Sequence, residues 1–127
     1  MRPIFKALST IALATTALTA PAMADPVYMI AQIQIEDHEA FFNEYGAAAG
    51  PIVVGNGGRV LVASPAVETL EGAWTGNWTV VIEFPSEEAA NQGWYNSDAY
   101  QQAIELRTAS TSLNNLVLAP AFVPPSQ

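Results

Sequence analysis

Glu83 is the side chain of this sequence best placed for acid–base chemistry. It lies near the end of an apolar run, on the face of a predicted strand that points away from Trp78 and Ile82. A carboxylate enclosed among apolar groups holds its proton more readily than one in water, and it could serve as a general base. The alternative is a structural ion pair with Arg59 or Arg107, because such pairs are common without catalysis. Glu83 is therefore the candidate catalytic residue, with the structural role left open.

Two arginines are the candidate anion-binding residues. Arg59 follows two glycines and begins a predicted strand, and its guanidinium group could hold a ligand carboxylate through two hydrogen bonds. Because acidic residues greatly outnumber basic ones, an intramolecular ion pair is the alternative. Arg107 falls in the last turn of a predicted helix, where the helix dipole by itself also favours a cation.

Three further side chains are ligand-binding candidates. Tyr28 and Gln32 lie on the mixed face of the first predicted strand, where they could orient a ligand. Tyr100 lies on a helical segment close to Trp94 and Tyr95, and it could frame the mouth of a pocket. Aromatic residues at helical spacing usually belong to a core, so both roles stay open for Tyr100.

Composition excludes several other kinds of site. The sequence has no cysteine and a single histidine, His38, which rules out thiolate and multi-histidine metal centres. We therefore expect no metal, and the sequence indicates no cofactor. The formal net charge is −8, and an acidic surface repels nucleic acids and anionic membranes. Neither is an expected partner.

Residues 1–24 have the pattern of a secretory signal peptide. Arg2 and Lys6 precede a short uncharged run of small and apolar residues, and Ala22-Met23-Ala24 provides a cleavage pattern. The run is too short and too rich in threonine for a membrane-spanning helix. We expect cleavage after Ala24, a periplasmic or secreted protein, and no membrane attachment afterwards.

The remaining chain is predicted to form one domain at residues 25–119, followed by a proline-rich tail at residues 120–127. Loss of Arg2 and Lys6 leaves two of the four basic residues against all 12 acidic ones, a net charge of −10. A domain of this size is near the lower limit for burying a full core alone. Because no cysteine is available for a disulfide, association of two copies is a natural source of further burial.

The pattern of apolar residues predicts strand, helix, strand, then the same again. Asp37, Ser86 and Ser97 are the predicted helix caps. The first helix is expected to be interrupted at Gly50-Pro51, with at most one more turn before Gly55. The predicted strands are residues 27–35, 59–64, 77–84 and 113–119; in the second of them Arg59, Leu61 and Ala63 should share one face.

This order predicts an α+β fold of the ferredoxin-like βαββαβ type, with a four-stranded antiparallel sheet and helices on one face. The other face would carry Tyr28, Ile30, Leu61 and Val81 among polar groups. An apolar face of that kind is expected to meet a partner, and the simplest partner is a second copy in a two-fold homodimer. Two facing sheets would enclose a cavity.

The sequence also resembles a known family. The resemblance begins with Ile33-Gln34-Ile35, Asp37, Glu39-Ala40-Phe41 and Tyr45, continues with Gly57-Gly58-Arg59 and Leu70-Glu71-Gly72, and is dense in Val81–Ser86, Ala89-Ala90, Trp94-Tyr95, Ser97, Tyr100-Gln101 and Leu106-Arg107. These residues are similar to the domain of unknown function 1330 family, within the dimeric α+β barrel superfamily. The resemblance covers about residues 27–119. It implies a ferredoxin-like fold and a dimer, and it implies no settled activity.

The sequence departs from this family at two places. Members often carry a further arginine near the position of Ala63, and a basic residue near Leu113-Asn114. Neither is present here. If those cations bind a substrate in other members, this chain has lost or altered that role.

Two functions remain open from the sequence. The first is binding of a small organic ligand, with or without catalysis, in a cleft at the dimer interface, where Glu83 would be base or acceptor, Arg59 an anion clamp, and Tyr28 and Gln32 orienting groups. The second is a non-catalytic structural or interaction homodimer with no ligand site. Cofactor-free oxygenases occur in the superfamily, but that is an analogy of fold alone.

Overall fold

A computed structural model describes residues 24–126 of the chain. It contains a four-stranded sheet in the order β2-β3-β1-β4, with every neighbouring pair antiparallel. The strands are β1 (Val27–Ile35), β2 (Arg59–Ser64), β3 (Trp78–Phe84) and β4 (Thr111–Pro120). This arrangement confirms the predicted ferredoxin-like α+β fold. The fourth strand is longer at both ends than the sequence pattern indicated.

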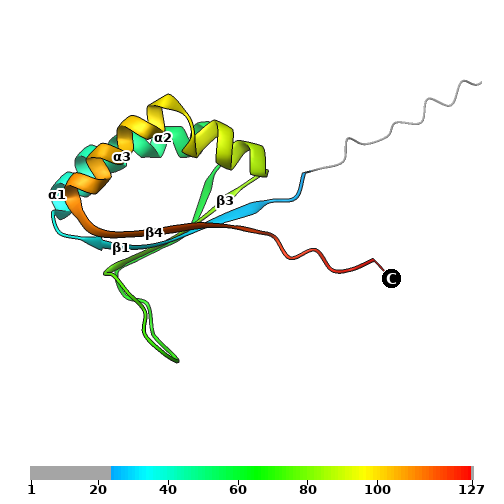
Figure 1. Cartoon of the computed structure of the whole chain (residues 1–127), viewed down its shortest axis with the longest axis horizontal. Coiled ribbons are helices and arrows are strands. Elements are labelled where there is room, and N and C mark those ends of the chain that lie inside the picture. The colour runs from blue at the N-terminus through cyan, green and yellow to red at the C-terminus, as the bar shows by residue number, and fades with distance from the viewer. Residues whose placement is uncertain (1–23, 127) are drawn as a thin grey trace, which may run out of the picture.

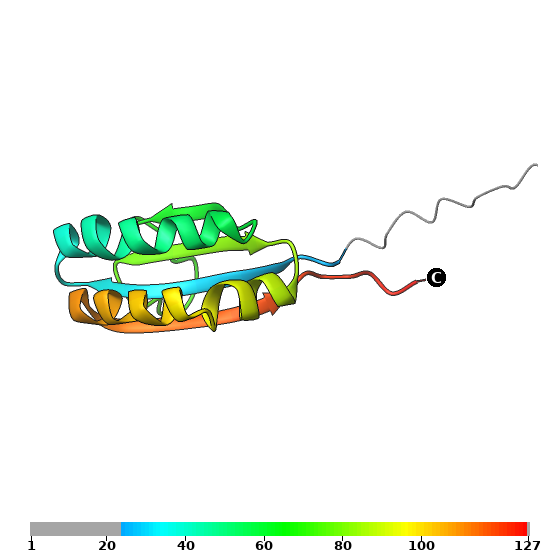
Figure 2. The same ribbon diagram turned by 90° about the horizontal axis from the view of Figure 1, so that it is seen from above.

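The helices form one layer on a single face of the sheet, in two rows that lie side by side (Figures 1 and 2). The first row is one continuous stretch made of α1 (His38–Ala40), the π-helical turn η1 (Phe41–Gly46) and α2 (Ala47–Gly55). The second row comprises η2 (Ala89–Tyr95) and α3 (Asp98–Ser110). The break between η2 and α3 is at Asn96-Ser97, and Ser97 is one of the predicted caps.

All three predicted helix caps are confirmed. The backbone N–H of Ala40 donates to Asp37 Oδ1 at 3.0 Å. Ser86 Oγ accepts from the N–H of Ala89 at 3.0 Å, and Ser97 Oγ accepts from the N–H of Tyr100 at 3.1 Å. Each cap satisfies an N–H group that the helix leaves unpaired, which explains why local sequence alone located these starts.

The predicted interruption of the first helix at Gly50-Pro51 is wrong. The helix passes through both residues and ends only at Gly55. A residue before proline normally avoids helical geometry because its Cβ clashes with the proline ring. Gly50 has no Cβ, so this clash is absent and the helix can continue through Pro51.

The predicted alternation along β2 is also wrong beyond Val60. A bulge between Val60 and Val62 shifts the pairing with β3, so that Val62 lies opposite Val81 and Ala63 opposite Val80. Ala63 therefore lies on the helix side of the sheet, away from Arg59. A bulge inserts an extra residue in one strand and reverses the alternation after it.

The core lies between the sheet and the helices. β1 contributes its whole helix-facing side, and β3 contributes Ile82 and Phe84. From the helices come buried aromatic and small residues, with Trp94 stacked on Phe84 at 5.1 Å between ring centroids. The buried apolar residues are Val27, Met29, Ala31, Ile33, Ile35, Phe41, Ala49, Val53, Ile82, Phe84, Ala90, Trp94, Tyr100 and Ala103.

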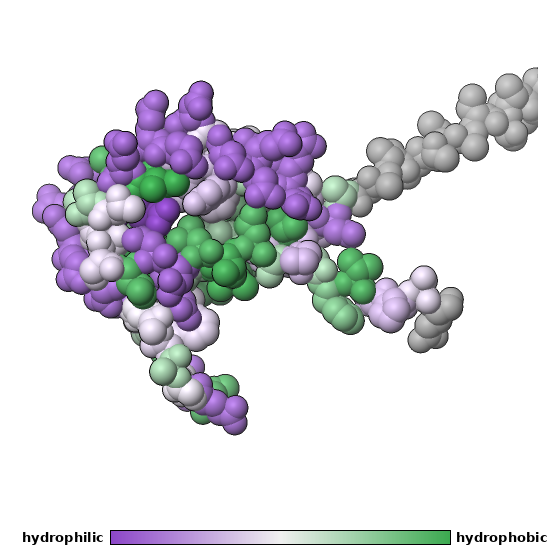
Figure 3. All heavy atoms as spheres, viewed as in Figure 1, coloured by the Kyte–Doolittle hydropathy of each residue, from purple (hydrophilic) through white to green (hydrophobic). Residues whose placement is uncertain are grey.

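The other face of the sheet has no helix over it. The long connection between β2 and β3, residues 65–77, projects from this side (Figure 1). Figure 3 shows hydrophobic residues gathered along the second half of β4, below the helices. Val117 of β4 is paired with Ile30 of β1 and is 57% exposed. We call this helix-free side the open face.

Within residues 24–126, no helix combines the length and hydrophobicity that crossing a membrane requires. The expected signal peptide lies almost wholly outside the described residues.

Candidate functional site

The sheet brings three of the predicted site residues together on the open face. Glu83 on β3 is paired with Tyr28 of β1 on one side and with Arg59 of β2 on the other. Arg59 Nη2 lies 3.2 Å from Glu83 Oε1, and the two form an ion pair. The Arg59 side chain is 71% exposed, so in the single chain this pair contributes at most about 1 kcal/mol of stability.

Glu83 also affects Tyr28. The protonated phenol can donate a hydrogen bond to the carboxylate, and this raises the pKa of Tyr28 above its ordinary value. Desolvation and the negative charge of Glu83 act in the same direction, and Arg59 acts against them. Arg59, Glu83 and Tyr28 thus form a row of a guanidinium group, a carboxylate and a phenol across three neighbouring strands.

Gln32 shares this face but has a local partner. Its Oε1 accepts a hydrogen bond from Thr75 Oγ1 at 2.8 Å, which ties the connection between β2 and β3 to the sheet. Trp74 Nε1 donates to Thr79 Oγ1 at 2.9 Å and adds a second tie. Gln32 therefore serves the structure of this connection in the single chain.

Tyr100 and Arg107 lie on the opposite side of the sheet, in the helical layer. Both are on α3 and both are buried. The hydroxyl groups of Tyr100 and Tyr45 are 2.7 Å apart, and the Arg107 guanidinium carbon lies 5.9 Å from the centre of the Tyr45 ring. The sheet thus divides the predicted ligand-binding residues into two groups that cannot act on one molecule.

Arg107 is unusual for a buried cation. Its side chain is only 4% exposed, no carboxylate pairs with it among the described residues, and its Nε atom has no hydrogen-bond partner. Buried charges are normally paired, because the loss of water around them is costly. The position in the last turn of α3 supplies a favourable dipole, as the sequence suggested, but does not replace a partner.

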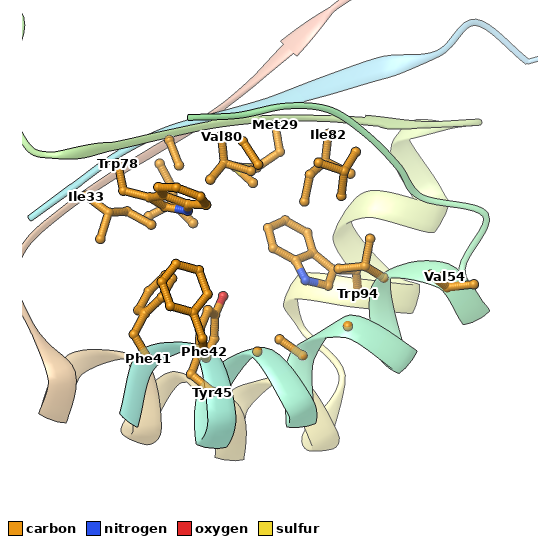
Figure 4. A pocket seen from close by; sticks show the side chains of 18 residues that line it. Met29, Ile33, Phe41, Phe42, Tyr45, Val54, Trp78, Val80, Ile82 and Trp94 are labelled. Carbon is orange, nitrogen blue, oxygen red and sulfur yellow. The ribbon is translucent and has the colours of Figure 1, made fainter. Parts of the chain in front are cut away.

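Beside this group lies a cavity of about 250 Å³ between the first helical row and the sheet (Figure 4). The sheet side is formed by residues of β1, β2, β3 and β4, and the helix side by residues of η1 and α2 together with Trp94. The lining residues are Met29, Ala31, Ile33, Phe41, Phe42, Tyr45, Gly46, Ala49, Gly50, Val53, Val54, Val60, Ala63, Trp78, Val80, Ile82, Trp94 and Leu116.

The cavity opens at the free edge of β2. Its exposed large side chains come only from the first helical row and from β2: Phe42 is 44% exposed, Val54 72% and Val60 55%. The mouth is therefore apolar. Gly46 and Gly50 lie one helical turn apart along its helix side, where a Cβ at Gly50 would meet no atom within 4 Å.

The residues that the sequence did not identify are those of this cavity. Tyr45 and Trp94 were named in the family resemblance, and Trp94 also as a neighbour of Tyr100, but neither was predicted to line an empty space. Two small residues at helical spacing beside aromatic ones, Gly46 and Gly50 after Phe42 and Tyr45, were the available signal. For metals, no cluster of three or more potential ligands occurs in the part of the chain that the structure describes.

Comparisons place the chain among known folds. Residues 26–121 match the family model described as a domain of unknown function (DUF1330). No curated protein matches the sequence. Among solved structures, the chain is similar to RPA0582, a protein of unknown function from Rhodopseudomonas palustris, with 21% identity, a TM-score of 0.64, and 79% of this chain and 85% of that chain covered.

Two further structures share the fold at lower identity. SnoaB, a cofactor-independent oxygenase from Streptomyces nogalater, is 14% identical with a TM-score of 0.53, covering 82% of this chain and 97% of that one. A protein from Caulobacter crescentus CB15 described as an antibiotic biosynthesis monooxygenase is also 14% identical, with a TM-score of 0.55 and coverage of 80% and 93%. At such identities the likeness shows the fold alone.

Proposed function

The chain belongs to the DUF1330 family of domains of unknown function, and from that premise we propose that it binds a small, largely apolar organic molecule in the cavity between the first helical row and the sheet. The observation that carries this proposal is the lining, which is almost wholly aromatic and aliphatic and contains no charged residue. Apolar cavities hold water poorly and accept apolar guests. A ligand there would gain the free energy of leaving water.

The dimensions limit the ligand. A volume of about 250 Å³ lies just below the range of pockets that hold drug-sized molecules. It suits a molecule of one or two rings. The apolar mouth at Phe42, Val54 and Val60 gives such a molecule a path that avoids the acidic surface.

A variant that fills the cavity tests this proposal. A leucine at Gly46 would project from the helix side of the cavity, where its Cβ meets only the Phe41 carbonyl oxygen at 3.5 Å. Gly55→Leu is the matched control, because it adds the same side chain to the end of α2, outside the lining. The probe is the two-ring hydrocarbon tetralin, and its binding is followed by the fluorescence of the three tryptophans, of which Trp78 and Trp94 line the cavity.

We expect Gly46→Leu to weaken tetralin binding by about tenfold or more, because the added side chain occupies the site. Gly55→Leu should bind as the unmodified protein does. The proposal is wrong if no apolar probe of one or two rings binds, or if tetralin binds both variants equally well while both remain folded.

A second site is favoured by the row of Arg59, Glu83 and Tyr28 on the open face. We propose that two copies associate through this face, and that a cleft between them brings the row next to a small organic ligand. Glu83 would then act as base or acceptor, Arg59 as anion clamp, and Gln32 as an orienting group. Covering the face would remove water and strengthen each of these interactions. A homodimer without any ligand at this face is the alternative.

We also propose that the protein is exported and processed after Ala24, on the sequence pattern alone. The mass of the protein recovered from cells that express the whole chain measures this. A mature chain that begins at Asp25 supports export, and a chain that retains Met1 contradicts it.

A further inference from the structure

The polar groups that line the cavity are almost all hydrogen-bond donors. The lining residues with polar side-chain groups are Tyr45, which has a hydroxyl, and Trp78 and Trp94, which each have an indole N–H; the lining has no carboxylate, no amide side chain, and no serine or threonine. An indole N–H donates and cannot accept. A ligand that satisfies these groups must therefore bring the acceptor.

Trp94 supplies one donor that the protein leaves without a partner. The residue is 1% exposed, and its Nε1 atom has no hydrogen-bond partner among the described residues. Figure 4 shows the Trp94 ring between the sheet and the first helical row, with the nitrogen on the side that faces this row. Buried N–H groups are rarely left unpaired in folded proteins, and each exception calls for an explanation.

Tyr45 supplies a second donor. The Tyr45 and Tyr100 hydroxyl groups are 2.7 Å apart, so one of their two protons is used between them and one is left over. Tyr100 is fully buried among the rings of Trp94 and Tyr95, and it does not line the cavity. The arrangement in which Tyr100 donates to Tyr45 leaves the spare proton on Tyr45. Figure 4 shows the Tyr45 hydroxyl directed from the helix toward the sheet.

Tyr45 keeps this proton. Burial raises its pKa far above the ordinary value, the neighbouring Tyr100 raises it further, and the opposing effect of Arg107 is smaller. The hydroxyl therefore stays protonated, and it is free to donate to a ligand in the arrangement in which Tyr100 donates to Tyr45.

From these groups we infer that the ligand is a neutral, largely hydrocarbon molecule of one or two rings that carries a ketone-type oxygen, held by Tyr45 and Trp94. This inference rests on the proposed function, because it assigns the chemistry of the same cavity. A charged ligand is disfavoured, since no lining residue carries a charge. A pure hydrocarbon would leave both donors unpaired.

A matched pair of probes tests the inference. Tetralin and 1-tetralone have the same two rings and differ by one carbonyl oxygen. The quantity measured is the ratio of their dissociation constants, in the unmodified protein and in Tyr45→Phe, which removes only the hydroxyl group. Tyr95→Phe is the control, because Tyr95 is partly exposed and lies outside the cavity.

We expect Tyr45→Phe to reduce the preference for 1-tetralone over tetralin by about tenfold, because a buried carbonyl oxygen loses a donor. Tyr95→Phe should leave the preference unchanged. In the unmodified protein, the carbonyl stretching band of bound 1-tetralone should shift to lower frequency than in hexane, and this second measurement does not depend on the stability of a variant.

The outcomes separate the two proposals. The inference is overturned, and the cavity site stands, if tetralin binds and Gly46→Leu abolishes its binding, while Tyr45→Phe leaves the preference for 1-tetralone unchanged and the carbonyl band of bound 1-tetralone lies where it does in hexane. If neither probe binds, the proposed function itself fails.

Discussion

At the scale of the residue, alternation along β1 and β3 was enough to group Glu83 with Tyr28. Pairing of the strands then added Arg59 to the same row. Tyr100 and Arg107 lie on α3, in the helical layer on the other side of the sheet, as helices on one face of the sheet imply, and they do not join this row. The candidate functional residues therefore fall into two groups: a polar row on the open face, and the hydrogen-bond donors beside the cavity on the helix-covered face.

The row on the open face predicts how the pKa of Tyr28 depends on Glu83. Since Glu83 raises the pKa of Tyr28 above its ordinary value of 10.0, the protonated phenol is favoured in the folded protein. Its stabilising contribution is complete below pH 10 and is lost as the pH rises through the folded-state pKa. In Glu83→Gln the pKa of Tyr28 should fall, so that the loss begins at lower pH.

The measurement is an NMR titration of the tyrosine ring carbons, with Glu88→Gln as the control for removal of a distant carboxylate. A pKa of Tyr28 that is equal in the two variants would show that Glu83 does not act on it. The same Glu83→Gln protein tests the second proposed site, since loss of ligand binding or turnover with an unchanged melting temperature supports a functional role.

At the scale of the element, the local sequence correctly predicted the helix caps, but it did not predict two other features. The helix through Gly50-Pro51 and the bulge in β2 each depend on how one segment meets its neighbours. The end of the connection between β2 and β3 is fixed in the same way. Asn77 exchanges side-chain hydrogen bonds with the backbone of Ile35, and Gly76 lies directly against Ile33.

Two glycines of this connection allow two costs of an added side chain to be measured separately, backbone strain and steric contact. Gly72 and Gly76 have φ angles of 73° and 89°, which disfavour any side chain. A Cβ at Gly72 meets nothing within 4 Å, but one at Gly76 would lie 2.5 Å from the Ile33 carbonyl oxygen. We expect Gly72→Ala to cost about 1 kcal/mol of the free energy of unfolding, and Gly76→Ala about 2–4 kcal/mol.

Urea denaturation of both variants measures the two costs. Equal losses in the free energy of unfolding would mean that backbone strain alone causes them, and that the contact between this connection and β1 adjusts at no measurable cost.

At the scale of the whole molecule, one face of the sheet is covered by helices and the other is not. The open face carries Ile30, Val81 and Val117 in addition to the polar row, and Val62 at its edge. An apolar surface of this kind is expected to be covered by a second copy. Negative charge on the remaining surface keeps other contacts weak.

The dimer is tested by the mass of the mature chain in solution. Residues 25–127 should sediment as a dimer at micromolar concentration, and Val117→Asp should weaken association by about tenfold or more, because a carboxylate would be buried without a partner. Leu106→Asp, on an exposed position of α3, is the control and should remain dimeric. A monomer of the unmodified chain at that concentration would contradict the proposed association and remove the second site with it.

The sequence by itself determined the order of elements, the caps at Asp37, Ser86 and Ser97, and the sheet topology. The elements and caps depend on the periodicity of apolar residues and on local hydrogen bonding, which are properties of short segments. The sheet topology follows from the order of the elements, because few connections between them are allowed. Only the tertiary structure decided that Arg107 is buried without a carboxylate, that Ala63 turns to the helix side, and that a space remains beside Tyr45 and Trp94. Those features depend on how closely the helical layer approaches the sheet, and that distance is set by all the packed side chains together.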